Sequence, residues 1–130
     1  MRKKNITMNT FFNPPLTVDA QRVIVHVVLN YILKQKHVNP QNPSLSSSPI
    51  YRKAVAEACY LLSEYFLIPD KTVRKTLGIS YHIWASYMQR VLFQYEQYKW
   101  FEEKIELYAD EINDLLTSHD LPKAPLNDEI

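Results

Sequence analysis

Glycine and cysteine are almost absent from this chain of 130 residues, which has one of each, Gly78 and Cys59. A β-sandwich or β-barrel needs many tight turns, and such turns favour glycine, so the shortage of glycine argues against both folds. A single cysteine cannot form an intramolecular disulfide and fits a reducing compartment, so we expect a cytoplasmic protein. No run of about 18 apolar residues is present, so we expect no membrane-spanning helix.

The residue patterns of the common catalytic and metal sites are also missing. The four histidines have no HxxxH or HExxH spacing, and one cysteine cannot supply a usual zinc site. No GxxxxGK[ST] sequence, which would cradle phosphates, occurs. Cys59 has apolar neighbours in the middle of an expected helix, which favours a buried, inert thiol over a nucleophile. We therefore expect neither an enzyme, nor a metal site, nor a cofactor.

Long segments free of glycine and proline remain, and they favour helices. Within them, apolar residues recur every three or four positions, as on one face of an amphipathic helix. We predict an all-α fold, a compact bundle of about five helices with a long C-terminal amphipathic helix. The segments are 16–39, 50–68 and 79–121.

Residues that favour helix starts mark the boundaries of these elements. Thr17 or Asp19 can cap the first helix, and Ser48 followed by Pro49 is typical of the start of the next. After a break at Ile68-Pro69, Asp70 can cap a short helix over residues 71–77.

The one glycine lies between two helix-compatible runs, in Leu77-Gly78-Ile79-Ser80. Glycine adopts a positive φ without steric cost, as the end of a helix often requires, and Ser80 can cap the helix that follows. A helix, a short turn with glycine and a second helix form the helix-turn-helix pattern, in which the second helix enters the DNA major groove.

We predict contacts with DNA bases from the outward face of the helix that follows Ser80, and phosphate contacts from the cations around it. The predicted base-contacting residues are Tyr81, His82, Ile83, Ala85, Ser86 and Gln89. The predicted phosphate-contacting residues are Arg52, Lys53, Lys71, Arg74, Lys75 and Arg90.

Apolar residues continue at steps of three and four through residues 91–116. The run is either one long helix or two helices with a break near Gln94–Lys99. Its apolar side chains either pack on the rest of the domain or form a coiled-coil-like seam, through which the chain would form a homodimer.

Charge is distributed unevenly, although the net charge is only +1. Residues 1–49 carry six basic and one acidic side chain, whereas residues 96–130 carry three basic and ten acidic ones. This polarity fits either a positive face for nucleic acid or a solvated surface without a partner. We expect a flexible basic arm at 1–15, a helical domain at 16–117 and a flexible acidic tail at 118–130.

Several short segments appear in an order that matches one known domain. An apolar first helix ends in Tyr31-Ile32, and a polar loop rich in serine leads to the basic start Tyr51-Arg52-Lys53. The helix AVAEACYLLSEY, the short segment TVRKTLG and a helix opening near His82 follow.

This order resembles the C-terminal DNA-binding domain of the bacterial replication initiator DnaA, a TrpR-like helix-turn-helix domain, over about residues 18–116. The resemblance implies that the helix after Gly78 binds double-stranded DNA. Of the family's base-reading signature only His82 is kept, among Ser80, Tyr81, Ile83 and Trp84. The ATPase module of the initiator has no counterpart in the chain, so the resemblance implies no ATP-driven initiator.

In a second hypothesis the fold is the same, but the chain binds another protein instead of DNA. Exposed aromatic side chains near the turn suit a protein interface as well as a DNA groove. The chain would then be a protein-interaction module, such as an accessory protein of a phage, a plasmid or another mobile element.

Overall fold

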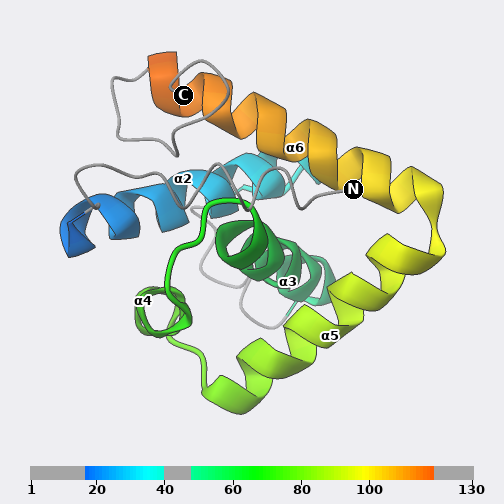
Figure 1. Cartoon of the computed structure of the whole chain (residues 1–130), viewed down its shortest axis with the longest axis horizontal. Coiled ribbons are helices and arrows are strands. Elements are labelled where there is room, and N and C mark those ends of the chain that lie inside the picture. Colours follow the sequence, from blue (N-terminus) through cyan, green and yellow to red (C-terminus); the bar gives the residue numbers. More distant parts are fainter. Residues whose placement is uncertain (1–16, 40–47, 119–130) are drawn as a thin grey trace.

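The computed structural model describes residues 17–39 and 48–118. Within them the chain forms five α-helices and no strand, which confirms the all-α prediction. The predicted basic arm, and the tail beyond Ser118, lie outside the described residues. The helices are α2 (Val18–Gln35), α3 (Pro49–Glu64), α4 (Asp70–Leu77), α5 (Tyr81–Gln97) and α6 (Lys99–Ser118) (Figure 1).

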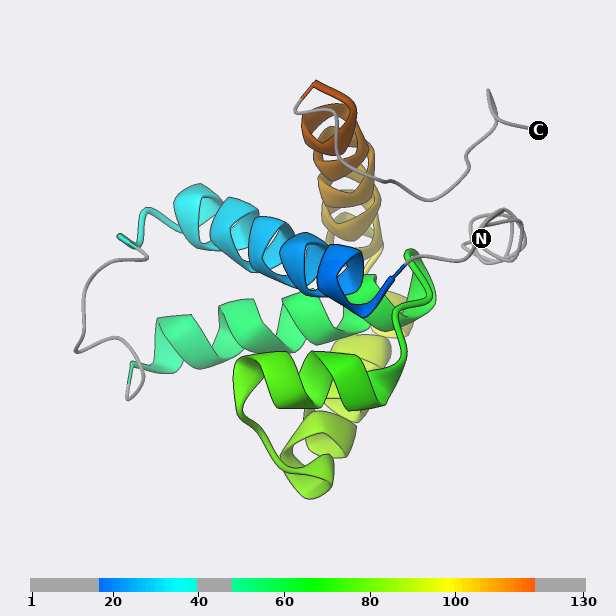
Figure 2. The ribbon, with the colours of Figure 1, turned by 90° about the vertical axis from the view of Figure 1, so that its left-hand side faces the viewer.

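Helix α3 lies at the centre of the fold and contacts all four of the other helices (Figure 1). Every side chain from Ala54 to Leu62 is buried, because neighbours cover this helix on all sides. Helices α2, α3 and α4 lie alongside one another, and α5 and α6 cross behind them (Figure 2). The alanines at 54, 56 and 58 allow the other helices to approach α3 closely.

Local capping residues set several of the helix boundaries, as the sequence predicts. The Thr17 hydroxyl accepts a hydrogen bond from the Ala20 N–H (3.1 Å), and Ser48 accepts from Ile50 and Tyr51 ahead of Pro49. Gly78 has φ +70° and ends α4, and the Ser80 hydroxyl accepts from the Ile83 N–H (3.2 Å) at the start of α5.

The prediction that Asp70 caps α4 is wrong. Pro69 occupies the cap position and no side chain caps this helix. Asp70 already belongs to the first turn, where its carboxylate accepts a hydrogen bond from Arg74 (3.0 Å). Pro69 (ψ 140°) thus stands where Asp70 is expected, and the helix begins at Asp70 itself.

The run over residues 81–118 is two helices rather than one. Tyr98 is extended (φ −125°, ψ 115°) and separates α5 from α6 at a sharp corner (Figure 1). The break falls inside the segment Gln94–Lys99. Of the two alternatives left open by the sequence, two helices are therefore present rather than one long helix.

Most of the apolar side chains of residues 91–116 are buried in the core of the same chain. Val91, Tyr95, Phe101 and Ile105 are nearly inaccessible, whereas Tyr98, at the corner, is exposed. These side chains therefore pack on their own domain, and a dimer through this region would have to use other residues.

Among the described helices, none combines the length and the apolar content that crossing a bilayer requires.

Candidate nucleic-acid interface

The first three turns of α5 present a largely exposed face. Ser80 fixes the start of the helix, and the side chains of Trp84, Tyr87 and Met88 pack partly against the core on its inner side. In both ribbon views this end of α5 lies at the lower edge of the molecule (Figures 1 and 2). Of the six predicted base-contacting residues, five are exposed and Ala85 is half-buried: Tyr81, His82, Ile83, Ala85, Ser86 and Gln89.

Helix α4 carries three of the predicted phosphate-contacting cations, and one of them, Arg74, contacts the start of α5. Lys71 and Lys75 are exposed, whereas Arg74 is half-buried. The Arg74 guanidinium forms an ion pair with Asp70 (3.0 Å) and lies 5.6 Å from the centre of the Tyr81 ring. Arg74 therefore links the two helices and orients Tyr81, and much of its charge is already balanced.

The other predicted phosphate-contacting cations belong to α3 and to the middle of α5. Arg52 and Lys53 are exposed in the first turn of α3. Arg90 is exposed near the middle of α5, and its guanidinium lies 5.9 Å from the ring centre of Tyr87. Lys53 and Arg90 line one small cavity, so residues 37 positions apart meet there. The six cations thus fall into groups on different helices.

A buried carboxylate, which the sequence analysis does not single out, lies beside that cavity. Glu57 is only 4% exposed, and its carboxylate forms ion pairs with Lys36 of the α2 C-cap (3.1 Å) and Lys104 of α6 (3.2 Å). Two ammonium groups thus balance one buried charge, as a charge in a protein interior requires. An acidic residue inside the otherwise apolar run AVAEACYLL is the signal that could have found it.

Hydrogen-bonded tyrosines attach α5 to its neighbours. The Tyr95 hydroxyl donates to Glu106 of α6 (2.8 Å) and lies 3.0 Å from the Tyr65 hydroxyl, which therefore donates to Tyr95. Burial, with the Glu106 carboxylate adding to it, raises the pKa of Tyr95 to about 12. This chain of hydrogen bonds fixes the C-terminal end of α5 and so positions its exposed N-terminal face.

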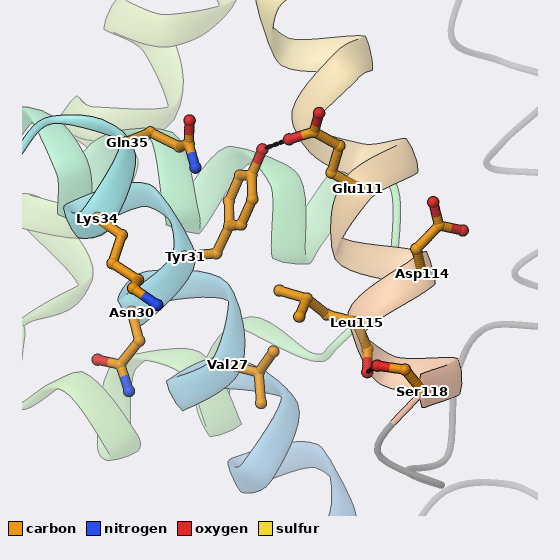
Figure 3. A pocket seen from close by; sticks show the side chains of 9 residues that line it. All are labelled: Val27, Asn30, Tyr31, Lys34, Gln35, Glu111, Asp114, Leu115 and Ser118. Carbon is orange, nitrogen blue, oxygen red and sulfur yellow. Dashed lines mark hydrogen bonds between the residues drawn. The ribbon is translucent and has the colours of Figure 1, made fainter.

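A larger open groove separates α2 from α6, with a volume of about 840 Å³ (Figure 3). The Tyr31 hydroxyl donates to the Glu111 carboxylate across it, and the Tyr31 and Tyr108 rings meet edge to face at 5.4 Å. Burial, followed by this carboxylate, raises the pKa of Tyr31. Val27 and Leu115 face each other lower in the groove.

Other chemistry is sparse in the part of the chain that the structure describes. Cys59 is buried, as expected, and burial raises the pKa of its thiol to about 12, so the reactive thiolate is disfavoured. No three His, Cys, Asp or Glu side chains among residues 17–39 and 48–118 are grouped to hold a metal ion.

Comparisons with protein-family models, with curated proteins and with solved structures find no match to this chain. The resemblance to the DnaA C-terminal domain therefore stays a prediction from the sequence.

Proposed function

We propose that this chain is a double-stranded DNA-binding module that acts as a helix-turn-helix protein, with the N-terminal half of α5 in the major groove. The observation that carries the proposal is the exposed face from Tyr81 to Arg90, which is supported from behind by the core and accompanied by the cations of α4. This face contains hydrogen-bonding groups for base edges and apolar groups for thymine methyls.

The dimensions of α5 suit a major groove. An α-helix with its side chains is roughly 10–12 Å across, and the groove is about 12 Å wide. In this arrangement His82, Ser86 and Gln89 read bases, while Lys71 and Lys75 bind phosphates beside the groove. Arg74 acts mainly by holding Tyr81 in place.

Salt-dependent affinity for duplex DNA tests this proposal. Replacing both Lys71 and Lys75 by alanine removes two phosphate contacts, so the slope of log affinity against log salt becomes shallower by about two. The matched control is Arg22→Ala with Lys34→Ala, which removes two exposed cations from α2. Equal slopes for the wild-type protein and the α4 double variant in a fluorescence-anisotropy titration would contradict the proposal.

A protein-interaction module is the second candidate, and the exposed apolar side chains favour it. Tyr81 and Ile83 are 55% and 44% exposed at the start of α5, and Phe93 and Trp100 are still more exposed near the corner. Aromatic residues of this kind are enriched at protein interfaces. An absence of any mobility shift with random duplex at low salt and micromolar protein would favour this function over DNA binding.

A further inference from the structure

A small, partly enclosed cavity lies where the end of α2 meets α3, α5 and α6, and four cations are among the residues that line it. Its volume is about 130 Å³. Four cations and one carboxylate line it, so the local formal charge is +3. We call it the Glu57 pocket, and its chemistry comes from Lys36, Lys53, Glu57, Arg90, Trp100 and Lys104.

Glu57 holds two of these cations in place. Lys36 Nζ lies 3.1 and 3.3 Å from the two carboxylate oxygens, and Lys104 Nζ lies 3.2 Å from one of them. The Lys104 ammonium also sits 4.6 Å from the centre of the Phe101 ring. Each ammonium has three N–H donors, so both keep donors free after these contacts. The carboxylate thus prepares two fixed, partly desolvated donors.

Lys53 and Arg90 add two charges that have no ion-pair partner among the described residues. Both are exposed and both line the pocket. Within residues 17–39 and 48–118, no carboxylate lies within ion-pair distance of either side chain. Like charges gathered around one cavity repel each other, so an anion in the pocket lowers the energy of the arrangement.

We infer that the Glu57 pocket binds a phosphate group. A phosphate group carries at least one negative charge and several acceptor oxygens, which match a guanidinium fork and ammonium point charges together. The volume admits a phosphate group but no whole nucleotide, so the rest of any larger ligand would lie outside, beside the exposed Trp100 ring. The pocket shares Lys53 and Arg90 with the proposed DNA surface, but inorganic phosphate alone can test it.

Isothermal titration calorimetry of the full chain with inorganic phosphate, against sodium chloride at matched ionic strength, measures this affinity. We expect saturable binding that Lys53→Gln combined with Arg90→Gln weakens at least about tenfold, which corresponds to about 1.4 kcal/mol. The control that removes two exposed cations elsewhere, Arg22→Gln with Lys34→Gln, should leave the affinity unchanged. Absence of saturable binding, or equal affinity in the pocket variant, overturns the inference.

Glu57→Gln provides a test of opposite sign. It raises the formal charge of the pocket from +3 to +4, and its amide oxygen can still accept a hydrogen bond from an ammonium group, so phosphate should bind more tightly than to the wild-type chain. Should this variant not fold, the Lys53 and Arg90 pair decides the matter, since both side chains are exposed. Weaker phosphate binding by a folded Glu57→Gln variant would contradict the proposed electrostatics.

Duplex DNA separates the two sources of phosphate. Competition by inorganic phosphate beyond the effect of matched chloride identifies the DNA backbone as the ligand, whereas DNA binding without such competition identifies a free phosphate ligand. Both outcomes support the pocket. A chain that binds phosphate and no DNA leaves the pocket in place and overturns the proposed function alone.

Discussion

Two carboxylates in this protein make ion pairs of about the same length and in very different surroundings. The Glu57 side chain is 6% exposed and meets Lys36 and Lys104 at 3.1 and 3.2 Å. The Asp70 side chain is 41% exposed and meets Arg74 at 3.0 Å, four residues along the same helix. Distance alone therefore does not distinguish the two, and burial and sequence separation do.

The comparison teaches which pairs the fold depends on. At the surface, water competes for both charges, so a pair such as Asp70 with Arg74 contributes little. In the interior, the net value of a complete ion pair is small, but the loss of one partner leaves a charge without compensation. Glu57 joins the end of α2 to α6 through α3, so its removal affects three helices at once.

Glu57→Ala should give the largest effect. It leaves the Lys36 and Lys104 ammonium groups partly buried around an empty space, so we expect a loss of about 3–5 kcal/mol in the free energy of unfolding. Urea denaturation followed by circular dichroism measures this loss. Glu103→Ala, at an exposed position of α6, is the control. A loss below about 1 kcal/mol would remove the distinction between the two carboxylates.

Alkaline pH should destabilise the folded chain by an intermediate amount, through the ionisation of Tyr108 near Glu57. Burial, followed by the Glu57 and Glu111 carboxylates, raises the pKa of Tyr108 to about 12 from its ordinary value of 10. The stability that the protonated phenol contributes is complete below pH 10, where both states are protonated. It is lost as the pH rises from 10 through 12, because only the unfolded chain ionises readily.

Tyr108→Phe tests this pH dependence, because phenylalanine cannot ionise. Between pH 9 and pH 12 the variant should lose about 1–2 kcal/mol less stability than the wild-type chain. Urea denaturation at each pH gives both curves. Parallel curves would show that Tyr108 titrates alike in the folded and unfolded chains. Tyr98→Phe is the control, since Tyr98 is exposed.

Asp70→Asn should give the smallest effect. The exposed i,i+4 pair contributes about 0.3–0.5 kcal/mol, and the position of the aspartate at a helix start adds a similar amount. The loss should shrink in high salt, which screens both terms. Asp19→Asn, in the first turn of α2 beside Arg22 at 3.9 Å, is a matched control. A salt-independent loss as large as that of Glu57→Ala would reverse the comparison.

Local chemistry explains what the sequence predicts well. The Ser80 cap and the left-handed backbone conformation of Gly78 follow from the preferences of single residues. The helices follow from the spacing of apolar side chains. Asp70 shows the limit of such reasoning, because a residue suited to cap a helix can equally stand one position inside it and pair with a neighbour. The break at Tyr98 is undecided in the sequence, since the aromatic residues there fit a continuous helix as well.

Contacts between distant residues explain what the sequence does not predict. Lys36 and Lys104 lie 21 and 47 residues from Glu57, and no local pattern joins them. In the candidate site, helical periodicity predicts an outward face of α5. Its polar residues His82, Ser86 and Gln89 are exposed as predicted. The meeting of Lys53 with Arg90 depends on how α3 crosses α5, which periodicity does not determine.

Gly78 has a stereochemical consequence. At φ +70° a Cβ atom would meet nothing within 4 Å, so space does not restrict this position. The restriction comes from the backbone alone, because L-amino acids disfavour this conformation and D-amino acids prefer it. Tolerance of substitutions at residue 78 is therefore set by how well a side chain accepts a positive φ rather than by its size. Asparagine ranks next to glycine and β-branched residues rank last.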